Sequence, residues 1–321
     1  MNKFIMLTGL PGSGKSTYCK SHPDYVHISS DALRKEMGFD AGKGNNVVFS
    51  EMMVRTKEHL GKGQSVIWDS TNLMRKHRIE MLIRLSKYNI PKHCICFTEP
   101  IDVCIRRNNR RTGFDKVPES VIYNMAKNFT VPNEYEGFNE VRFIQTVEGI
   151  DPAKYLKMAE NFDQDNPHHD MTLYEHMNVT YKCACELLKE SSLSEQMKEN
   201  VRLAALYHDI GKLYTKDYHD NKGNETDIAH YYQHENIGAY MYLSSAAKSE
   251  DKKVVSTLIN WHMRPYLKDM SEKKREAERT MLGEELCEAL DILHEADMIS
   301  HRFHNKGMDV FERDDQDEPE R

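Results

Sequence analysis

Short apolar runs and amphipathic stretches alternate through the first half of the chain. Each apolar run has the length of a buried strand, and apolar positions recur at helical spacing between the runs. This alternation is typical of a parallel α/β sheet with helices on both faces. The runs predict strands over 4–8, 25–28, 65–69, 93–98 and 141–147, and the stretches between them predict helices over 15–21, 31–37, 46–60, 75–88, 101–110 and 118–129.

The pattern changes after Gly149, where only helical spacing remains. We therefore predict an α/β domain over residues 1–148 and an all-α domain over residues 171–311. The segment 149–170 is polar and contains two prolines, so it is interpreted as a linker, and 312–321 as an acidic, disordered tail. Helices are predicted over 172–190, 195–209, 230–247, 251–262 and 283–303.

Composition narrows the class of protein. The chain has 321 residues, enough for about two domains of ~150 residues. No apolar stretch approaches the ~20 residues of a membrane span and no signal peptide fits, so we expect a soluble cytoplasmic protein with no membrane partner. Seven cysteines without a CxxC pair are expected to be reduced thiols. Residues 1–150 carry 22 basic against 16 acidic side chains, which suits a polyanionic substrate, whereas the remainder carries 22 against 35.

A complete phosphate-binding loop follows the first predicted strand and opens the first predicted helix. Its glycines let backbone N–H groups curl around phosphates, Lys15 reaches the β- and γ-phosphate oxygens, and Ser16 holds Mg²⁺. A glycine-rich turn with an exposed lysine is disfavoured by this strand-loop-helix context. The sequence therefore predicts ATP and Mg²⁺ as ligands. The expected nucleotide-binding residues are Gly9, Gly12, Ser13, Gly14, Lys15, Ser16 and Thr17.

Polar residues that follow other strands suggest an acceptor site. Asp31 and Arg34 are three residues apart at a helix start and therefore share a face. The Asp31 carboxylate could take the proton of an attacking hydroxyl, and Arg34 could fix an acceptor phosphate. Alternatively, Asp31 is only the N-cap of its helix. Asp69 follows the third strand, at the sheet edge where α/β proteins bind ligands.

Four arginines lie within six residues after a short predicted helix. They are Arg106, Arg107, Arg110 and Arg111. This cluster is either a solvated helix face or a lid that closes on the transferred phosphate, and the phosphate-binding loop favours the lid.

In this order, the loop, Asp31-x-x-Arg34, Asp69-x-Thr71-Asn72, the arginines and Val117-Pro118 resemble the phage-type 5′-polynucleotide kinase family over residues 1–147. The resemblance implies transfer of the ATP γ-phosphoryl group to a 5′-hydroxyl of RNA or DNA. It also implies that Asp31 is the general base and that Arg34 holds the 3′-phosphate of the acceptor. Arg107 is then expected at the nucleotide, and either Arg110 or Arg111 at the transition state.

The helical half resembles the HD phosphohydrolase superfamily. Each residue that carries the resemblance lies in a predicted helix or at its end: His176, His208, Asp209, His234, His262 and Asp297. His301 falls outside the pattern, and His219 and His230 are interpreted as surface residues or as residues that lie behind the ligands.

Coordination chemistry explains this set of six. His176, His208, Asp209 and Asp297 would hold one metal ion, and His234 with His262 would hold a second one, bridged through Asp209. Mixed nitrogen and oxygen ligands suit Mn, Fe, Co, Ni or Zn. Such a pair of ions can activate water for attack on phosphorus. Lys212 could neutralise the substrate phosphate.

Two classes of enzyme remain open. The leading hypothesis is a bifunctional nucleic-acid end-healing enzyme: a 5′-kinase joined to a phosphohydrolase that removes a 3′-, 2′- or 2′,3′-cyclic phosphate and prepares ends for a ligase. The alternative is a nucleoside or metabolite kinase fused to a nucleotidase or a di-iron oxygenase. An ATP-gated binding module with a vestigial HD domain is less favoured, because no catalytic position is missing from either half.

Overall fold

The computed structural model describes residues 2–166, 171–247, 251–267 and 270–304. The chain divides into two compact units. The first comprises the residues up to Asp151 together with Leu243–Ala247, and the second comprises the rest. The predicted acidic tail, 312–321, lies outside the described residues.

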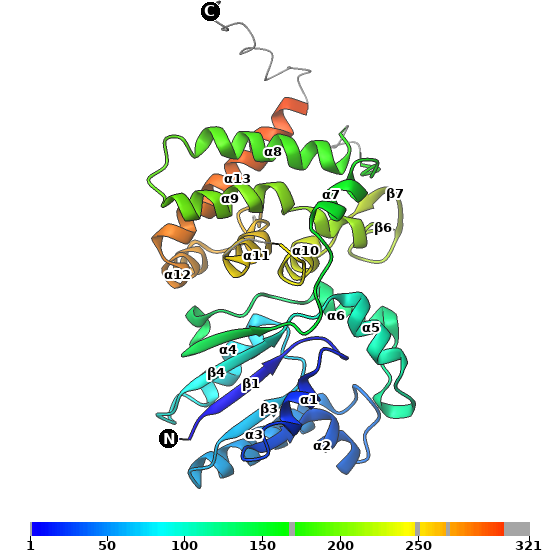
Figure 1. Cartoon of the computed structure of the whole chain (residues 1–321), viewed down its shortest axis with the longest axis vertical. Coiled ribbons are helices and arrows are strands. Elements are labelled where there is room, and N and C mark those ends of the chain that lie inside the picture. Colours follow the sequence, from blue (N-terminus) through cyan, green and yellow to red (C-terminus); the bar gives the residue numbers. More distant parts are fainter. Residues whose placement is uncertain (1, 167–170, 248–250, 268–269, 305–321) are drawn as a thin grey trace, which may run out of the picture. The chain divides into compact units, whose positions relative to one another are not determined.

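The first unit is built on one five-stranded parallel sheet (Figure 1), as predicted. Its strand order is β2-β3-β1-β4-β5, and every neighbouring pair is parallel. The strands are β1 (Phe4–Thr8), β2 (Val26–Ser29), β3 (Val66–Asp69), β4 (Lys92–Phe97) and β5 (Glu140–Ile144).

Two separate hydrophobic clusters cover the two faces of this sheet, because successive side chains of a strand point to opposite faces. Phe4 and Met6 of β1 belong to one cluster, with Trp68 of β3, whereas Ile5 and Leu7 belong to the other. The helices of this unit are α1 (Lys15–Lys20), α2 (Ser30–Glu36), α3 (Asn45–Gly61), α4 (Arg75–Arg84), α5 (Ile101–Asn109) and α6 (Glu119–Lys127).

The second unit is mainly helical, as predicted. Helix α8 packs against α9 and α13, and it starts with a capping box formed by Thr172 and Glu175. None of the helices in the described ranges has the length and apolar character needed to cross a membrane. The helices of this unit are α7 (Ala153–Ala159), α8 (Leu173–Leu187), α9 (Glu195–Tyr207), α10 (His234–Leu243), α11 (Lys252–Trp261), α12 (Glu272–Leu282) and α13 (Glu284–His304).

The second unit differs from the all-α prediction in one respect. Strands β6 (Asp217–His219) and β7 (Glu225–His230) form an antiparallel hairpin. The hairpin is mostly exposed, so it lacks the apolar run by which a strand is predicted. Helix α12 was missed for the same reason, because none of its residues is buried.

The segment that was interpreted as a linker contains a helix. Tyr155 and Ala159 of α7 are buried, and Gln164 beyond it is fully buried within the second unit. Seven residues are too few to show a clear helical period, which explains why this segment was interpreted as a polar linker.

Candidate functional site

The phosphate-binding loop connects β1 to α1 and depends on glycine at two positions. Gly12 has a φ of +84°, and a Cβ atom there would lie 2.4 Å from the carbonyl oxygen of Cys104. Gly14 has a φ of +103° and is the N-cap of α1. Only glycine adopts these conformations without strain. The loop therefore presents Lys15 and Ser16 on the first turn of α1.

The Lys15 side chain lies back against its own loop. Its ammonium donates hydrogen bonds to the carbonyl oxygens of Gly9 (2.7 Å) and Leu10 (2.9 Å). Burial lowers the pKa of Lys15; the charge of Asp69 opposes this shift, and the charge of Arg111 adds to it. The loop thus holds a buried cation at the place where phosphate oxygens are expected.

The structure rules out the cap interpretation of Asp31. Ser29 is the N-cap of α2, since its hydroxyl accepts a hydrogen bond from the N–H of Ala32. The Asp31 side chain is 73% exposed and pairs with the Arg34 guanidinium at 2.8 Å. The carboxylate is thus accessible and oriented by one arginine.

Arg34 is held by several partners. Its Nε donates to the carbonyl oxygen of Lys43 at 3.2 Å, and its Nη2 donates to Asn45 Oδ1 at 2.7 Å. The guanidinium also lies over the Phe49 ring at 5.9 Å. Because all three nitrogens are engaged, Arg34 acts in this structure as a rigid support for Asp31.

The four arginines near the end of α5 have different surroundings. Arg106 pairs with Asp102 on the surface. Arg107 donates to the carbonyl oxygen of Gly12 (3.4 Å) and to Thr146 Oγ1 (3.0 Å), so it lies against the phosphate-binding loop. Arg110 is exposed, whereas Arg111 is half-buried and close enough for its charge to lower the pKa of Lys15.

The segment after these arginines contacts α2. Lys35 pairs with Asp115 at 2.8 Å and lies over the Phe114 ring at 5.0 Å. These groups surround one cleft of about 2170 Å³ in the first unit. The residues that line the cleft include Lys15, Ser16, Asp31, Asp69, Arg110 and Arg111.

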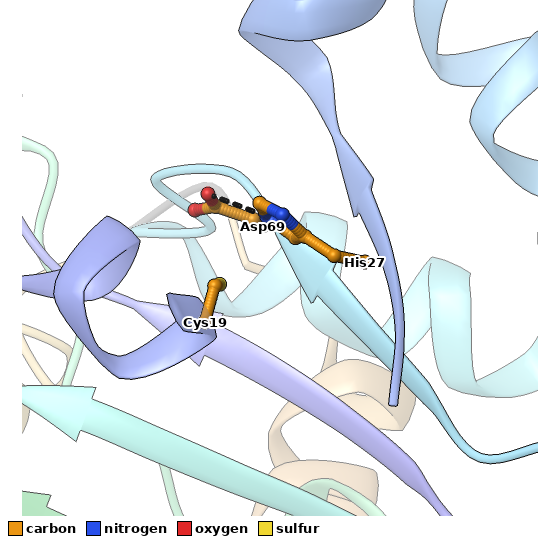
Figure 2. Close-up of side chains that lie close together, drawn as sticks. All are labelled: Cys19, His27 and Asp69. Carbon is orange, nitrogen blue, oxygen red and sulfur yellow. Dashed lines mark hydrogen bonds and ion pairs between the residues drawn. The ribbon is translucent and has the colours of Figure 1, made fainter. Parts of the chain in front are cut away.

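A group that the sequence did not indicate lies beside this cleft. His27 Nε2 is 3.0 Å from Asp69 Oδ2, and Cys19 lies next to them (Figure 2). His27 lies on β2 and Cys19 on α1. The pairing of β2 with β3 and the packing of α1 on the sheet bring both residues close to Asp69. The spacing of these residues along the sequence therefore could not have indicated that Cys19, His27 and Asp69 lie together.

The six predicted metal ligands meet in the core of the second unit. All are at most 6% exposed. Asp209 Oδ2 lies 3.3 Å from His176 Nε2 and 3.4 Å from His208 Nε2, and Asp297 Oδ1 lies 3.2 and 3.5 Å from the same nitrogens. Asp209 Oδ1 faces His234 Nε2 at 3.0 Å and His262 Nε2 at 3.8 Å. The two oxygens of Asp209 therefore face two separate sets of ligands.

Each of the four histidines has a hydrogen-bond partner at Nδ1, the ring nitrogen that points away from the carboxylates. The Nδ1 atoms of His208, His234 and His262 lie 2.7–2.8 Å from backbone carbonyl oxygens. The Nδ1 atom of His176 lies 3.3 Å from Ser300 Oγ. A carbonyl oxygen only accepts, so at least three rings carry the proton on Nδ1 and leave Nε2 free. This arrangement is the usual outer support of histidines that bind metals.

Electrostatics also fit a metal centre. Burial, with the nearby charges of His208 and His234, lowers the pKa of His262 to about 3. Burial alone would lower the pKa of His208. The negative charges and hydrogen bonds of Asp209 and Asp297 have a larger effect and raise that pKa to about 10. Two buried carboxylates thus attract positive charge, and the Nε2 atoms of four imidazoles converge on them. The donor set fits one or two divalent transition-metal ions.

Three further residues lie near this centre: Tyr266, which was missed from the sequence, His301, which was set outside the pattern, and Lys212, which was named from the sequence. Tyr266 donates a hydrogen bond to Asp297 Oδ2 at 2.7 Å. His301, which was set outside the pattern, lies 3.5 Å from Asp297 Oδ1, and its position four residues later on α13 could have indicated this. Lys212 is buried and contacts Asp209 Oδ2 (2.8 Å) and Gln164 Oε1 (2.9 Å).

Two family models match separate parts of the chain. Residues 4–132 match the AAA domain, and residues 173–301 match the HD domain. The chain therefore combines a P-loop kinase-like domain with an HD domain, and the prediction of this combination is confirmed.

Two curated relatives show more distant similarity. The transcription factor bHLH140 of Arabidopsis thaliana is 29% identical over 159 residues, which are 46% of this chain but only 16% of that protein. The L-seryl-tRNA(Sec) kinase of Methanococcus maripaludis is 24% identical over 242 residues, which are 66% of this chain and 89% of that protein.

Solved structures show only partial likeness. A candidate kinase from Chloroflexus aurantiacus has 16% identity and a TM-score of 0.37, over 46% of this chain and 89% of its own. A Pnkp1/Rnl/Hen1 complex has 21% identity and a TM-score of 0.31, over 36% of this chain and 42% of that one. Likeness at this level carries no argument about function.

Proposed function

We propose that this chain, a P-loop kinase-like domain joined to an HD domain, repairs the ends of nucleic acids. The first domain would phosphorylate the 5′-hydroxyl of RNA or DNA with ATP, and the second would remove phosphate from the 3′ end. One observation carries the proposal: the accessible carboxylate of Asp31 lines the same cleft as a complete phosphate-binding loop. The same chain also has a buried cluster of six candidate metal ligands.

The kinase step follows from the residues of the cleft. Asp31 takes the proton of the 5′-hydroxyl as its oxygen bonds to the γ-phosphorus, and the bond from that phosphorus to the β-γ bridging oxygen breaks, which releases ADP. Lys15 and Ser16 bind the phosphates and Mg²⁺. We assign Arg111 rather than Arg110 to the charge that develops in transfer, because Arg111 is half-buried and its charge acts on Lys15, whereas Arg110 is exposed.

Acceptor binding involves a rearrangement in this proposal. Arg34 is expected to hold an acceptor phosphate, yet its nitrogens are engaged by Asp31, Lys43 and Asn45. A phosphate would exchange for the Asp31 contact, which frees that carboxylate to accept the proton of the hydroxyl. Binding of the acceptor and activation of the base would then be a single event.

The second step uses the centre of the HD domain. Bound metal ions there supply Lewis acidity and a water of lowered pKa. Asp209 and Asp297 provide the negative charge, and the four Nε2 atoms provide the neutral ligands. Lys212, next to Asp209, would offer a positive charge to a phosphate oxygen. Water adds to phosphorus, the bond to the sugar oxygen breaks, and that oxygen takes a proton, leaving inorganic phosphate from a monoester.

Two further observations support a nucleic-acid acceptor. The excess of basic residues over 1–150 suits a polyanion. The Methanococcus relative is named as a kinase of a seryl-tRNA, so its named substrate is also joined to RNA. The competing candidate, a metabolite kinase fused to a nucleotidase or an oxygenase, would use the same groups on small molecules.

One assay with end-labelled RNA separates these possibilities. The RNA carries a 5′-hydroxyl and either a 3′-phosphate or a 2′,3′-cyclic phosphate, and it is incubated with ATP, Mg²⁺ and a panel of transition metals. Wild-type protein should yield a 5′-phosphate and a 3′-hydroxyl, the ends that a ligase joins.

Variants at the two centres provide the matched controls. Lys15→Ala should abolish only 5′-phosphorylation, and Asp209→Ala only removal of the 3′-end phosphate, because the groups lie in different units. If the metal-loaded protein leaves every 2′- and 3′-phosphate untouched but consumes free nucleotides or oxygen, the proposal fails for the HD domain. The hypothesis of a nucleotidase or an oxygenase then replaces it. Undiminished phosphorylation by Lys15→Ala would refute the kinase assignment.

A further inference from the structure

Three ligand types converge beside the kinase cleft (Figure 2). Cys19 comes from the last turns of α1, His27 from β2 and Asp69 from the end of β3. One donor atom of each, a thiol sulfur, an imidazole nitrogen and a carboxylate oxygen, lies within 4.8 Å of both others. Cys19 and Asp69 are buried, whereas the His27 side chain is 39% exposed and opens the group to solvent.

The fold brings these donors together with little freedom. Strand β2 pairs in parallel with β3, which sets Ser29 opposite Asp69 and places His27 one pleat earlier on the same face. Cys19 belongs to the hydrophobic cluster on that face, where α1 packs over Ile5, Leu7 and other core residues. The donors therefore stand on three elements of a packed core and not on a loose loop.

The chemistry of this set selects a particular class of cation. Thiolate is a soft ligand, and together with imidazole it favours Zn²⁺ over Mg²⁺, which prefers oxygen ligands. Three protein ligands leave one position of a tetrahedral ion for water. The three donor atoms lie within 4.8 Å of one another, so small side-chain movements would bring them to a common ion at ~2.0–2.3 Å.

We propose that Cys19, His27 and Asp69 form a site for a soft divalent cation, of which Zn²⁺ is the type, and that its occupation inhibits the kinase. Asp69 lines the cleft, and its charge acts on Lys15. An ion held there would cancel that negative charge and place a cation near Ser16, three residues before Cys19 on α1. Mg²⁺ would then be repelled from its position, so inhibition should be relieved by excess Mg²⁺. The inhibitory part rests on the proposed kinase function; binding of the ion does not.

Cobalt spectroscopy tests the site directly. The full chain, stripped of metal, is titrated with Co²⁺, and the thiolate-to-cobalt charge-transfer band in the near ultraviolet is recorded. Among the described residues, the six-residue centre of the second unit has no sulfur ligand, so the band reports the Cys19 group even in the wild-type protein. It should appear, disappear in Cys19→Ser and in His27→Ala, and persist in Cys185→Ser, a control thiol in α8. No band, or one that survives Cys19→Ser, overturns the site.

Stoichiometry and inhibition complete the test. In Asp209→Ala, which lacks the residue shared by both ligand sets of the second unit, we expect about one equivalent of tightly bound Zn²⁺ that is lost when Cys19→Ser is added. Zn²⁺ should weaken Mg²⁺-ATP binding and slow 5′-phosphorylation, and Cys19→Ser should raise the inhibitory concentration at least tenfold. If Zn²⁺ binds at Cys19 but leaves Mg²⁺-ATP binding unchanged, the regulatory part is wrong. If the band is present and no acceptor is phosphorylated, the proposed kinase function fails while the cation site stands.

Discussion

Asp31→Asn separates a chemical role of this residue from a structural one. The change removes the basic carboxylate and keeps the size of the side chain. Asn retains a carbonyl oxygen that can accept from Arg34, so the support of the side chain at 2.8 Å is preserved. If Asp31 is the general base, the variant should bind ATP normally and fail to transfer phosphate.

The structure sets the expected magnitudes. Ser29 caps α2, and the Asp31 side chain is 73% exposed, so the lost ion pair should cost about 1 kcal/mol of stability or less. A general base contributes ~10²–10⁴ in rate, or about 3–5 kcal/mol of barrier. The effect on kcat should therefore far exceed the effect on folding.

Two measurements on matched variants check this separation. Single-turnover phosphorylation of a 5′-hydroxyl oligonucleotide gives the rate, and thermal unfolding of the transition that ATP shifts gives the stability. Ser29→Ala is the opposite control: loss of the cap should cost ~1 kcal/mol and lower Tm by about 2–4 °C, with a much smaller effect on rate than Asp31→Asn. If Asp31→Asn retains more than a tenth of the wild-type rate, the assignment of Asp31 as the base is refuted.

Three further predictions concern the lid and the metal centre. Arg111→Ala should lower the single-turnover kinase rate by ~10²-fold or more and Arg110→Ala by less than tenfold, because Arg111 is half-buried beside the loop and Arg110 is exposed; equal losses would contradict the assignment. Addition of Mn²⁺ or Zn²⁺ to the metal-stripped chain should raise the Tm of the helical unit, and the rise should vanish in Asp209→Ala; a rise that survives that variant would place the metal elsewhere. Tyr266→Phe removes the hydroxyl that holds Asp297 and should weaken metal affinity by ~10–100-fold in a chelator competition, whereas unchanged affinity would show that the hydrogen bond is incidental.

The phosphate-binding loop, the parallel sheet and the candidate metal ligands could be predicted from the sequence, because each depends on a local segment or on residue type. The phosphate-binding loop lies in one continuous segment, so its glycines, Lys15 and Ser16 need only the strand before it and the helix after it. The sheet was predicted for the same reason, since its five strands are short apolar runs, each separated by helical spacing. The candidate metal ligands could be named because their residue types and their order along the chain resemble the HD phosphohydrolase superfamily, whose domain model matches residues 173–301.

The spacing of apolar residues did not predict elements whose residues are mostly exposed. The hairpin β6–β7 and helix α12 are held by polar, exposed residues, so no periodic burial marked them. The cap of α2 could also not be decided, because Ser29 and Asp31 are both good capping residues and only the backbone conformation shows which one is used.

The arrangement of the sites was decided by tertiary structure alone. Asp209 faces two sets of histidines because α8, α9, α11 and α13 pack against one another and His234, at the start of α10, joins them. These elements bring together residues up to 121 positions apart, from His176 to Asp297. The Cys19 group depends likewise on the register of two strands and the packing of one helix. A sequence fixes which side chains exist and the local period that buries them, but the distance between two donors depends on how the elements pack, which no single segment encodes.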